Sequence, residues 1–214
     1  MEELTKHKIF TMEDNKRDTL LTVAMSKFAS SGYKKTTTDE IILAAEISKG
    51  LLFHYFGTKK DLYIFLFKYA NAIIMQDFYD RIDMKKRDIF ERLRNIFLLK
   101  FELTNKYPAI FDFVASAYFE KDPAVAAKIN KCSNQLFQDA QKETFKDIDL
   151  SLFKANIDAS KAIDIIIYTF RGYSETQASP EKHIEDYNKE HERYIREIDD
   201  YIRVLRAAFY KEGK

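Results

Sequence analysis

Helix-capping signals recur at short intervals between residues 37 and 61, and they constrain the fold more than any other feature of the chain. Thr37 and Glu40 have the spacing of a capping box, in which each residue satisfies a backbone N–H of the other. Ser48 is a further N-cap candidate. Thr58 and Asp61 repeat the capping-box spacing. The pattern predicts two short helices and a longer one, joined by tight turns.

Apolar residues elsewhere in the chain recur at helical spacing. Leu20, Ala24 and Phe28 lie four residues apart, and Gly32 is placed to end their helix in a left-handed conformation, with Tyr33 folding back onto it. The helices expected on these grounds span about 17–31, 38–45, 48–56, 58–75, 88–106, 108 onward, 124–146, 158 onward and 186–210, with breaks at 147–157 and 178–180. Only 5 Gly and 3 Pro are present, too few for the many turns of a β-sandwich or barrel. We therefore expect an all-α fold.

The sequence shows no signal for secretion, membrane insertion or disulfide bonding. Its first ten residues lack the apolar core of a signal peptide. The most apolar stretch, residues 62–75, is interrupted by Lys68 and Asn71 and is shorter than the roughly 20 residues of a membrane-spanning helix. Cys132 is the single cysteine, which excludes an intrachain disulfide and fits a reducing compartment. We expect a cytoplasmic protein without a membrane partner.

Positive charge is concentrated in the capped region. The whole chain has a formal net charge of +1, whereas residues 16–60 contain eight basic and four acidic residues, a net of +4. A basic segment that also carries two short helices is typical of a nucleic-acid-binding module.

One set of residues in this region follows a recurring family pattern. Its members are Ala24, Phe28, Gly32, Tyr33, Thr36, Thr37, Ile41, Ala45, Ile47, Ser48, Gly50, Leu52, Tyr55, Phe56, Lys59 and Leu62. The arrangement resembles the TetR (tetracycline-repressor-like) family of bacterial regulators. The resemblance implies a three-helix helix-turn-helix DNA-binding domain at residues 1–60 and a helical ligand-binding and dimerisation domain at residues 61–214. It implies a homodimer formed by the last two helices, a palindromic double-stranded operator and a repressor released by a small molecule.

The resemblance also places the DNA contacts. The expected DNA-binding residues are Thr37, Thr38, Ser48, Lys49, Gly50, Leu51, His54, Tyr55 and Lys59. Lys49 and His54 supply hydrogen-bond donors, and Gly50 lets the backbone approach the major groove. Leu51 can touch a thymine methyl group. The threonines, Tyr55 and Lys59 suit phosphate contacts, which position the module without reading sequence.

Two positions depart from the family pattern. Glu46 stands where the family has Gly in the turn, which brings a side chain and a negative charge close to DNA. Phe53 replaces a Tyr whose hydroxyl meets a phosphate in relatives. Residues 1–13 precede the usual family start, and we expect either an arm that reaches the minor groove or a disordered, frayed tail, with Met12 as an alternative start.

Aromatic residues of the C-terminal half are candidates for an effector pocket. The candidates are Phe97, Phe101, Phe111, Tyr118, Phe137 and Tyr168, with Glu102 or Glu175 as charged partners. They predict an effector with apolar or aromatic character. Aromatic stripes at helical spacing also fit an ordinary core, so both interpretations stay open.

Other function classes find less support in the sequence. It has no Gly-rich phosphate loop, Gly-x-Ser-x-Gly elbow or His-Glu-x-x-His motif, and we expect no catalysis, cofactor or metal. His183 and His191 could hold a divalent metal, but their acidic surroundings fit a solvated helix face better. The main alternative is a helical small-molecule-binding or interaction module that has lost specific DNA binding, which Glu46 favours.

Overall fold

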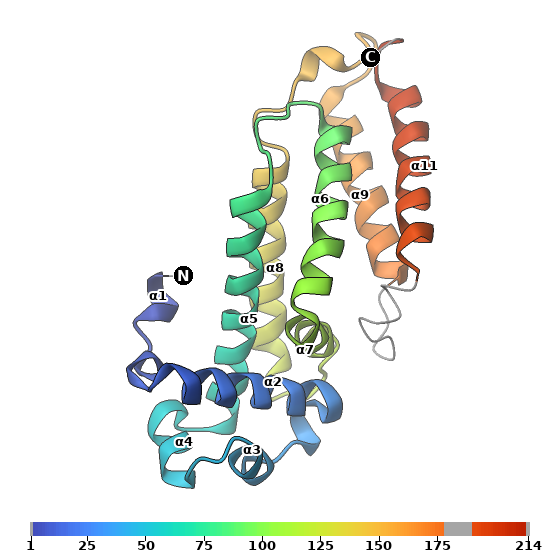
Figure 1. Ribbon diagram of the computed structural model, residues 1–214. Helices are drawn as coiled ribbons and strands as arrows, with labels where there is room; N and C mark the ends of the chain where they lie inside the picture. Colours follow the sequence, from blue (N-terminus) through green and yellow to red (C-terminus); the bar gives the residue numbers. More distant parts are fainter. Residues whose placement is uncertain (1, 178–189, 213–214) are drawn as a thin grey trace. The chain divides into compact units, whose positions relative to one another are not determined.

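The computed structural model describes residues 2–177 and 190–212, and its regular elements are helices (Figure 1). They are α1 Glu2–Thr5, η1 Lys8–Thr11, α2 Asp14–Lys35, α3 Thr38–Ala44, α4 Lys49–Phe56, α5 Lys59–Arg81, α6 Ile89–Lys106, α7 Pro108–Tyr118, α8 Ala126–Thr144, η2 Leu150–Leu152, α9 Ala159–Gln177 and α11 His191–Phe209. In these two ranges the β structure is one isolated antiparallel bridge between Phe153 and Tyr210. The all-α prediction is confirmed. The expected break at 178–180 and the expected helix start at 186 lie outside the described residues.

The chain forms two compact units. The first comprises residues 1–79 and 106–138, and the second comprises residues 80–105 and 139–214. Both sides of the boundary expected at residue 60 belong to the first unit. The functional division at residue 60 therefore stays a prediction.

The core of the first unit is built where α2 packs along α7 (Figure 1). Leu20, Ala24 and Phe28 are fully buried, which confirms the predicted apolar face of α2. The ring of Tyr63 on α5 lies edge-on to Phe28 at a centroid distance of 4.8 Å and edge-on to Phe113 on α7 at 5.5 Å. This aromatic contact joins three helices of the unit.

Residues 2–12 fold onto the first unit, contrary to the expectation of a disordered tail. Ile9 is fully buried. The His7 ring lies 5.4 Å from the ring of Phe56 and 4.5 Å from that of Phe65. Burial, and then the charge of Lys8, lower the pKa of His7, and its Nδ1 accepts the N–H of Ile9 at 3.2 Å. The apolar residues between positions 8 and 12 were the signal for this packing.

Gly32 produces a kink rather than the predicted helix end. Its φ of 71° is positive as expected, but its ψ of 172° is extended, and α2 resumes for a turn up to Lys35. The physical reason is that Thr36 closes this turn. Its N–H and its hydroxyl both donate to the carbonyl of Gly32, at 3.3 and 2.8 Å.

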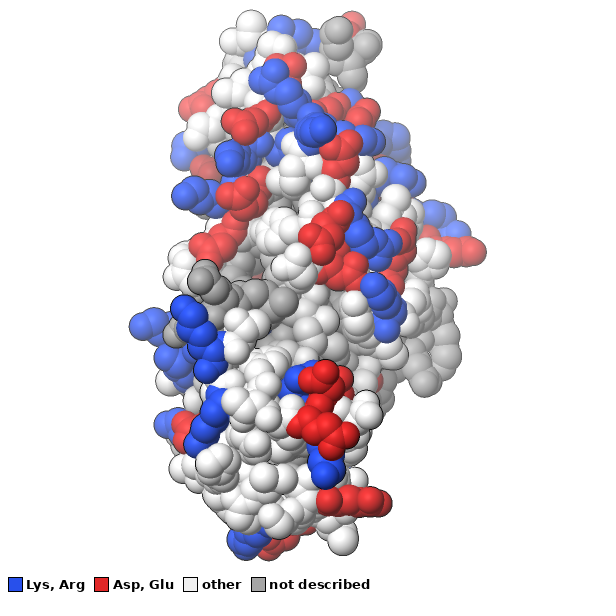
Figure 2. Space-filling view, turned by 60° about the vertical axis from the view of Figure 1, so that its left-hand side comes forward, with Lys and Arg blue, Asp and Glu red and all other residues white. Residues whose placement is uncertain are grey.

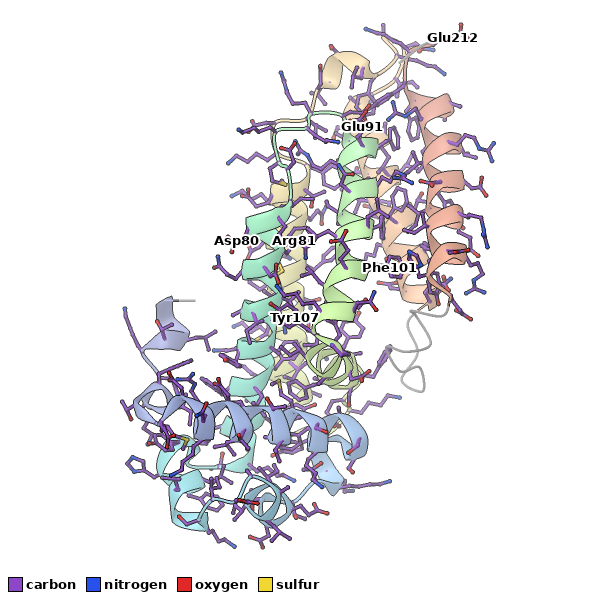
Figure 3. All side chains as sticks on the ribbon, in the orientation of Figure 1. Asp80, Arg81, Glu91, Phe101, Tyr107 and Glu212 are labelled. Atoms are coloured by element: carbon purple, nitrogen blue, oxygen red, sulfur yellow. The ribbon has the colours of Figure 1, made fainter. Side chains whose placement is uncertain are left out.

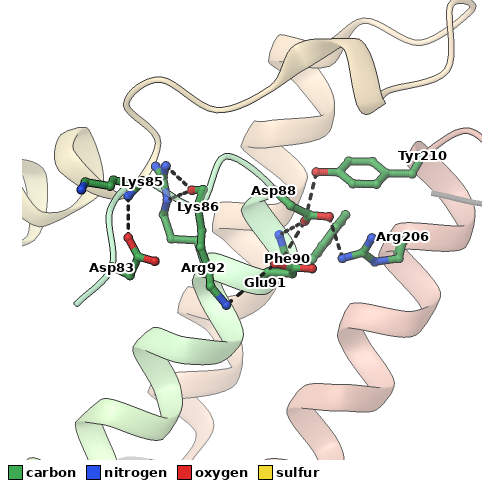
Figure 4. Close-up of polar contacts among 9 residues, drawn as sticks. All are labelled: Asp83, Lys85, Lys86, Asp88, Phe90, Glu91, Arg92, Arg206 and Tyr210. Carbon is green, nitrogen blue, oxygen red and sulfur yellow. Dashed lines mark hydrogen bonds and ion pairs between the residues drawn. The ribbon is translucent and has the colours of Figure 1, made fainter. Parts of the chain in front are cut away.

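The second unit is organised around a buried arginine. The Arg92 side chain has no exposed surface, and its guanidinium donates to backbone carbonyls of Met84, Lys86, Thr144 and Lys146. Figure 4 shows the contact with Lys86. The first two carbonyls belong to the segment before α6, and the other two belong to the end of α8 and the residues after it. Arg92 thus joins two segments that are distant in sequence.

Asp88 connects the start of α6 to the end of α11. Its Oδ1 accepts the N–H of Phe90 at 2.9 Å, and its Oδ2 lies 2.9 Å from the Arg206 guanidinium (Figure 4). The Phe90 ring packs edge-on against Tyr210 at 4.9 Å. Asp158 caps α9 in the same way, by accepting the N–H of Ser160 at 2.9 Å.

Candidate nucleic-acid interface

The two short helices begin at the predicted caps. Thr37 Oγ1 accepts the N–H of Glu40 at 3.2 Å, and the Glu40 carboxylate accepts the N–H of Thr37 at 2.8 Å. The N–H of Thr37, and then its hydroxyl, which donates to Oε2 of Glu40 at 2.9 Å, lower the pKa of Glu40. Ser48 Oγ accepts the N–H of Leu51 at 3.2 Å and so caps α4. Both short helices therefore begin where the sequence predicted.

One face of this helix pair is buried and the other is open. Ile41 of α3 and Leu52 and Phe56 of α4 lie in the core of the first unit. The predicted DNA-binding residues comprise five exposed ones, Thr37, Ser48, Lys49, Gly50 and His54, and four half-buried ones, Thr38, Leu51, Tyr55 and Lys59. A Cβ atom added to Gly50 would meet nothing within 4 Å. The first turn of α4 is thus accessible down to its backbone.

Aromatic side chains continue this surface along α4. The rings of His54 and Tyr55 contact edge-on at 5.0 Å. Phe53, which replaces the family's Tyr, is 36% exposed. Its apolar ring thus lies at the surface where relatives carry a hydroxyl.

Lys49 has a carboxylate partner that the sequence analysis missed. Its Nζ lies 3.0 Å from Oδ1 of Asp39 on α3, and both side chains are well exposed. An exposed ion pair of this kind contributes about 0–1 kcal/mol. The pair can open at little cost when a stronger acceptor approaches Lys49. No sequence spacing marks the pair, because α3 and α4 bring it together across the turn.

The turn between α3 and α4 is strained at Glu46. Its φ of 53° lies in the left-handed region, which glycine adopts without the clash that a Cβ atom causes. The family's Gly at this position therefore has a conformational reason, and this chain keeps the same backbone with a larger residue.

Replacing Glu46 by Gly is expected to raise the free energy of unfolding by about 1 kcal/mol, because the left-handed strain is relieved. It should also raise DNA affinity by removing a negative charge. Glu46→Ala is the matched control, since it removes the charge and keeps the strain. Urea denaturation of both variants separates the effects. Equal stability of the two variants would contradict the strain argument.

Lys59, which the sequence predicted to bind a phosphate, already makes two hydrogen bonds to the backbone of the first unit. Its Nζ donates to the carbonyls of Tyr33 at 2.8 Å and Thr36 at 3.0 Å, and lies 4.4 Å from the Tyr33 ring centre. An ammonium group has three donors, so one remains for a phosphate.

The predicted effector residues are divided between the two units. In the second unit, Phe97 packs on Phe170 at 5.4 Å, and Phe101 points from α6 towards α11, where Tyr194 lies 6.0 Å away (Figure 3). Tyr168 is 68% exposed on α9. The three candidates in the first unit comprise half-buried Phe111 and exposed Tyr118 and Phe137.

The two carboxylates proposed as effector partners both pair with arginines of their own unit. Glu102 contacts Arg81, and Glu175 contacts Arg171 at 2.9 Å. Phe97 and Phe101 are half-buried and pack against the core of the second unit. An effector role for any of the aromatic or acidic candidates stays a prediction.

Neither a metal centre nor a membrane span is found in the described part of the chain. Residues 2–177 and 190–212 contain no group of three His, Cys, Asp or Glu side chains placed to hold a metal ion. His191 packs on Phe101 at 5.2 Å, and His183 lies outside the described residues. None of the described helices is both long and apolar enough to cross a membrane.

Charged side chains of both signs are interspersed on the face shown in Figure 2. Uncharged stretches separate them there. Any electrostatic attraction of DNA through this face would therefore depend on individual lysines and arginines rather than on a continuous basic surface.

Comparison with known proteins assigns the fold and the family. The family model described as bacterial regulatory proteins, tetR family, matches residues 20–64, which contain α3 and α4. The HTH-type transcriptional regulator QacR of Staphylococcus aureus is 30% identical over 140 residues, which cover 64% of this chain and 72% of that protein. The chain belongs to the TetR family. As a TetR-family member it is a helix-turn-helix transcription regulator.

Solved structures of TetR-family regulators share the fold. A regulator from Chloroflexus aurantiacus is 20% identical and has a TM-score of 0.61, with 95% of this chain and 97% of that chain covered. FadR from Bacillus subtilis, solved with stearoyl-CoA, is 18% identical and has a TM-score of 0.57, with 88% and 96% covered. The TetR-like architecture thus extends over both units of this chain.

Proposed function

We propose that this TetR-family chain is a homodimeric repressor that binds a palindromic operator through α4 and is released by a small molecule of apolar or aromatic character. The observation that carries the proposal is the open first turn of α4, where Ser48, Lys49 and Gly50 are all exposed. This turn of a recognition helix is the part that reaches base edges in the major groove. The protein would act in the bacterial cytoplasm, without catalysis or cofactor.

Different residues of α3 and α4 would contact base edges and phosphates. Lys49 and His54 are exposed donors for base edges, and Leu51 offers an apolar contact. Thr37, Thr38 and Tyr55 lie at the margins of this surface and would hold phosphates. The alternative module without specific DNA binding keeps one supporting observation, the charged and strained Glu46.

Exposed apolar side chains on α9 and α11 support a homodimer. The two helices run side by side (Figure 1). Each exposes an apolar stripe, with Ile165 and Tyr168 on α9 and Tyr201 and Val204 on α11. Gly172 continues the α9 stripe, and a Cβ atom there would meet nothing within 4 Å. Glycine inside a helix costs about 1 kcal/mol relative to alanine, and close approach of a partner helix gives this position a reason.

Release by the effector would follow from two states of the dimer. One state holds the two recognition helices about one DNA turn apart, and the effector favours a splayed state. Phe97 and Phe101 supply aromatic surface in the effector half. Coupling is reciprocal, so operator and effector lower each other's binding affinity by the same factor. The coupling free energy is typically about 1–3 kcal/mol.

A band shift against DNA from upstream of its own gene tests the proposal. We expect a tight, salt-sensitive shift that Lys49→Ala with Tyr55→Phe weakens at least about tenfold, because a base contact and a phosphate contact are lost. Lys128→Ala on α8 is the matched control and should bind like the wild type. If no specific shift appears, selection from random DNA follows. Failure to enrich any sequence would favour the module without specific DNA binding.

A further inference from the structure

The peptide groups at the kink of α2 are held from two sides. The N–H of Tyr33 donates to Oε2 of Glu120 at 2.8 Å. The carbonyl of the same residue accepts a hydrogen bond from Nζ of Lys59 at 2.8 Å. Both partners are charged, and hydrogen bonds to charged groups are the stronger ones. Tyr33 is therefore bonded to the start of α5 through Lys59 and to the turn between α7 and α8 through Glu120.

Lys59 closes the helix-turn-helix on itself. It is the first residue of α5 and follows α4 after a short turn, whereas Tyr33 and Thr36 precede α3. Its ammonium binds the carbonyls of both and covers the Tyr33 ring at 4.4 Å. The two ends of the segment that contains α3 and α4 are therefore fixed to each other by one side chain.

Glu120 ties this closed segment to α7. Its Oε1 accepts the N–H groups of Lys121 at 2.9 Å and Asp122 at 2.8 Å, while Oε2 accepts the N–H of Tyr33. Both carboxylate oxygens are thus engaged by three backbone N–H groups. A glutamine could not reproduce this, because it has only one acceptor oxygen and its NH₂ group would face an N–H.

The kink itself makes the position sensitive. Gly32 has a φ of 71°, and its ideal Cβ position lies 3.5 Å from Oε2 of Glu120. Beneath the kink, the Tyr33 ring packs edge-on against Tyr63 at 5.1 Å, and Tyr63 contacts Phe113 of α7 at 5.5 Å. A displacement of α7 would therefore reach Tyr33 through ring packing and through the Glu120 hydrogen bond together.

The geometry points to Lys59 and Glu120 as positioning residues that hold the recognition helix through the backbone of Tyr33. This inference rests on the proposed function. It assigns Lys59 to the backbone of the kink instead of to a DNA phosphate.

Operator affinity at several salt concentrations separates the two roles of Lys59. Loss of a phosphate contact lowers the slope of log K against log salt by about 0.9, whereas loss of a positioning residue leaves the slope unchanged. We expect Lys59→Met to weaken binding about tenfold at constant slope. Lys60→Met, at the exposed neighbouring position, is the matched control. A slope reduced by about 0.9 in Lys59→Met would assign the residue to a phosphate and overturn the inference.

Glu120 is tested by a double-mutant cycle on the same operator. Glu120→Gln should weaken binding although it lies outside the helix-turn-helix, and with Lys59→Met the combined loss should be smaller than the product of the two. Glu143→Gln on α8 is the control and should leave binding unchanged. Wild-type affinity of Glu120→Gln, or independent effects of the two substitutions, would overturn the inference while leaving the proposed function intact.

Hydrogen exchange in the free proteins gives a readout that needs no DNA. Both Glu120→Gln and Lys59→Met should speed amide exchange in α3 and α4, while α9 and α11 stay protected and report an intact fold. Unchanged exchange in α3 and α4 would overturn the inference even if the wild type bound no operator, an outcome that would separately refute the proposed function.

Discussion

Replacing Arg92 by Met is expected to lower the free energy of unfolding by about 3–5 kcal/mol, because the four carbonyl groups that this buried side chain binds all lose their donor. The side chain is fully buried, and its bonds to Thr144 and Lys146 are 2.8 and 2.7 Å long. The carbonyl of Thr144 is that of the last residue of α8, where the helix dipole favours a cation, and Lys146 follows two residues later. Burial also lowers the pKa of Arg92.

Arg94→Met is the matched control for this prediction. Arg94 lies two residues after Arg92 on the same helix, α6, and its ion pair with Asp199 at 2.7 Å is exposed. Its loss should cost at most about 1 kcal/mol. Urea denaturation of both variants gives the comparison. Similar stability of the two would show that the Arg92 carbonyl bonds contribute no more than a surface ion pair.

Local signals in the sequence were sufficient to predict where the helices of the helix-turn-helix begin. The capping box at Thr37 and Glu40 and the cap at Ser48 are formed by residues three positions apart. Asp61 likewise donates its N–H to Thr58 Oγ1 at 3.1 Å, as its spacing predicted. Such bonds depend only on the chain nearby, so that a sequence pattern can predict them.

Contacts between distant segments carried no comparable signal. Glu120 reaches Tyr33, and Arg92 reaches Thr144, only because packing brings separate helices together. The same reason explains the folded N-terminal segment, where Ile9 is buried and the His7 ring contacts Phe56 and Phe65. It also explains why the sequence predicted a DNA contact for Lys59. The family pattern marks this position, whereas only the packing shows that the ammonium group binds the carbonyls of Tyr33 and Thr36.

The apolar stripe of α9 and α11 leads to the other large effect. Tyr168→Glu with Val204→Glu is expected to give a monomer whose operator affinity is lower by about 100-fold or more, because one head binds a half-site without the effective concentration supplied by its partner. The two side chains are 68% and 60% exposed in the single chain, so their replacement should leave its fold intact. Sedimentation velocity and operator binding measure the two outcomes.

Gly172→Leu separates the dimer from the stability of the single chain. A Cβ atom added at Gly172 meets nothing within 4 Å in the single chain, so we expect the leucine to extend outward from α9 and to remove the helix-destabilising glycine. A partner helix packed against this position would instead be pushed away. We expect unchanged or higher stability of the monomer together with lost dimerisation and operator binding. Arg196→Glu on α11, away from the stripe, is the control and should remain dimeric. A Gly172→Leu protein that dimerises like the wild type would place the interface elsewhere, because no close helix contact could accept the larger side chain.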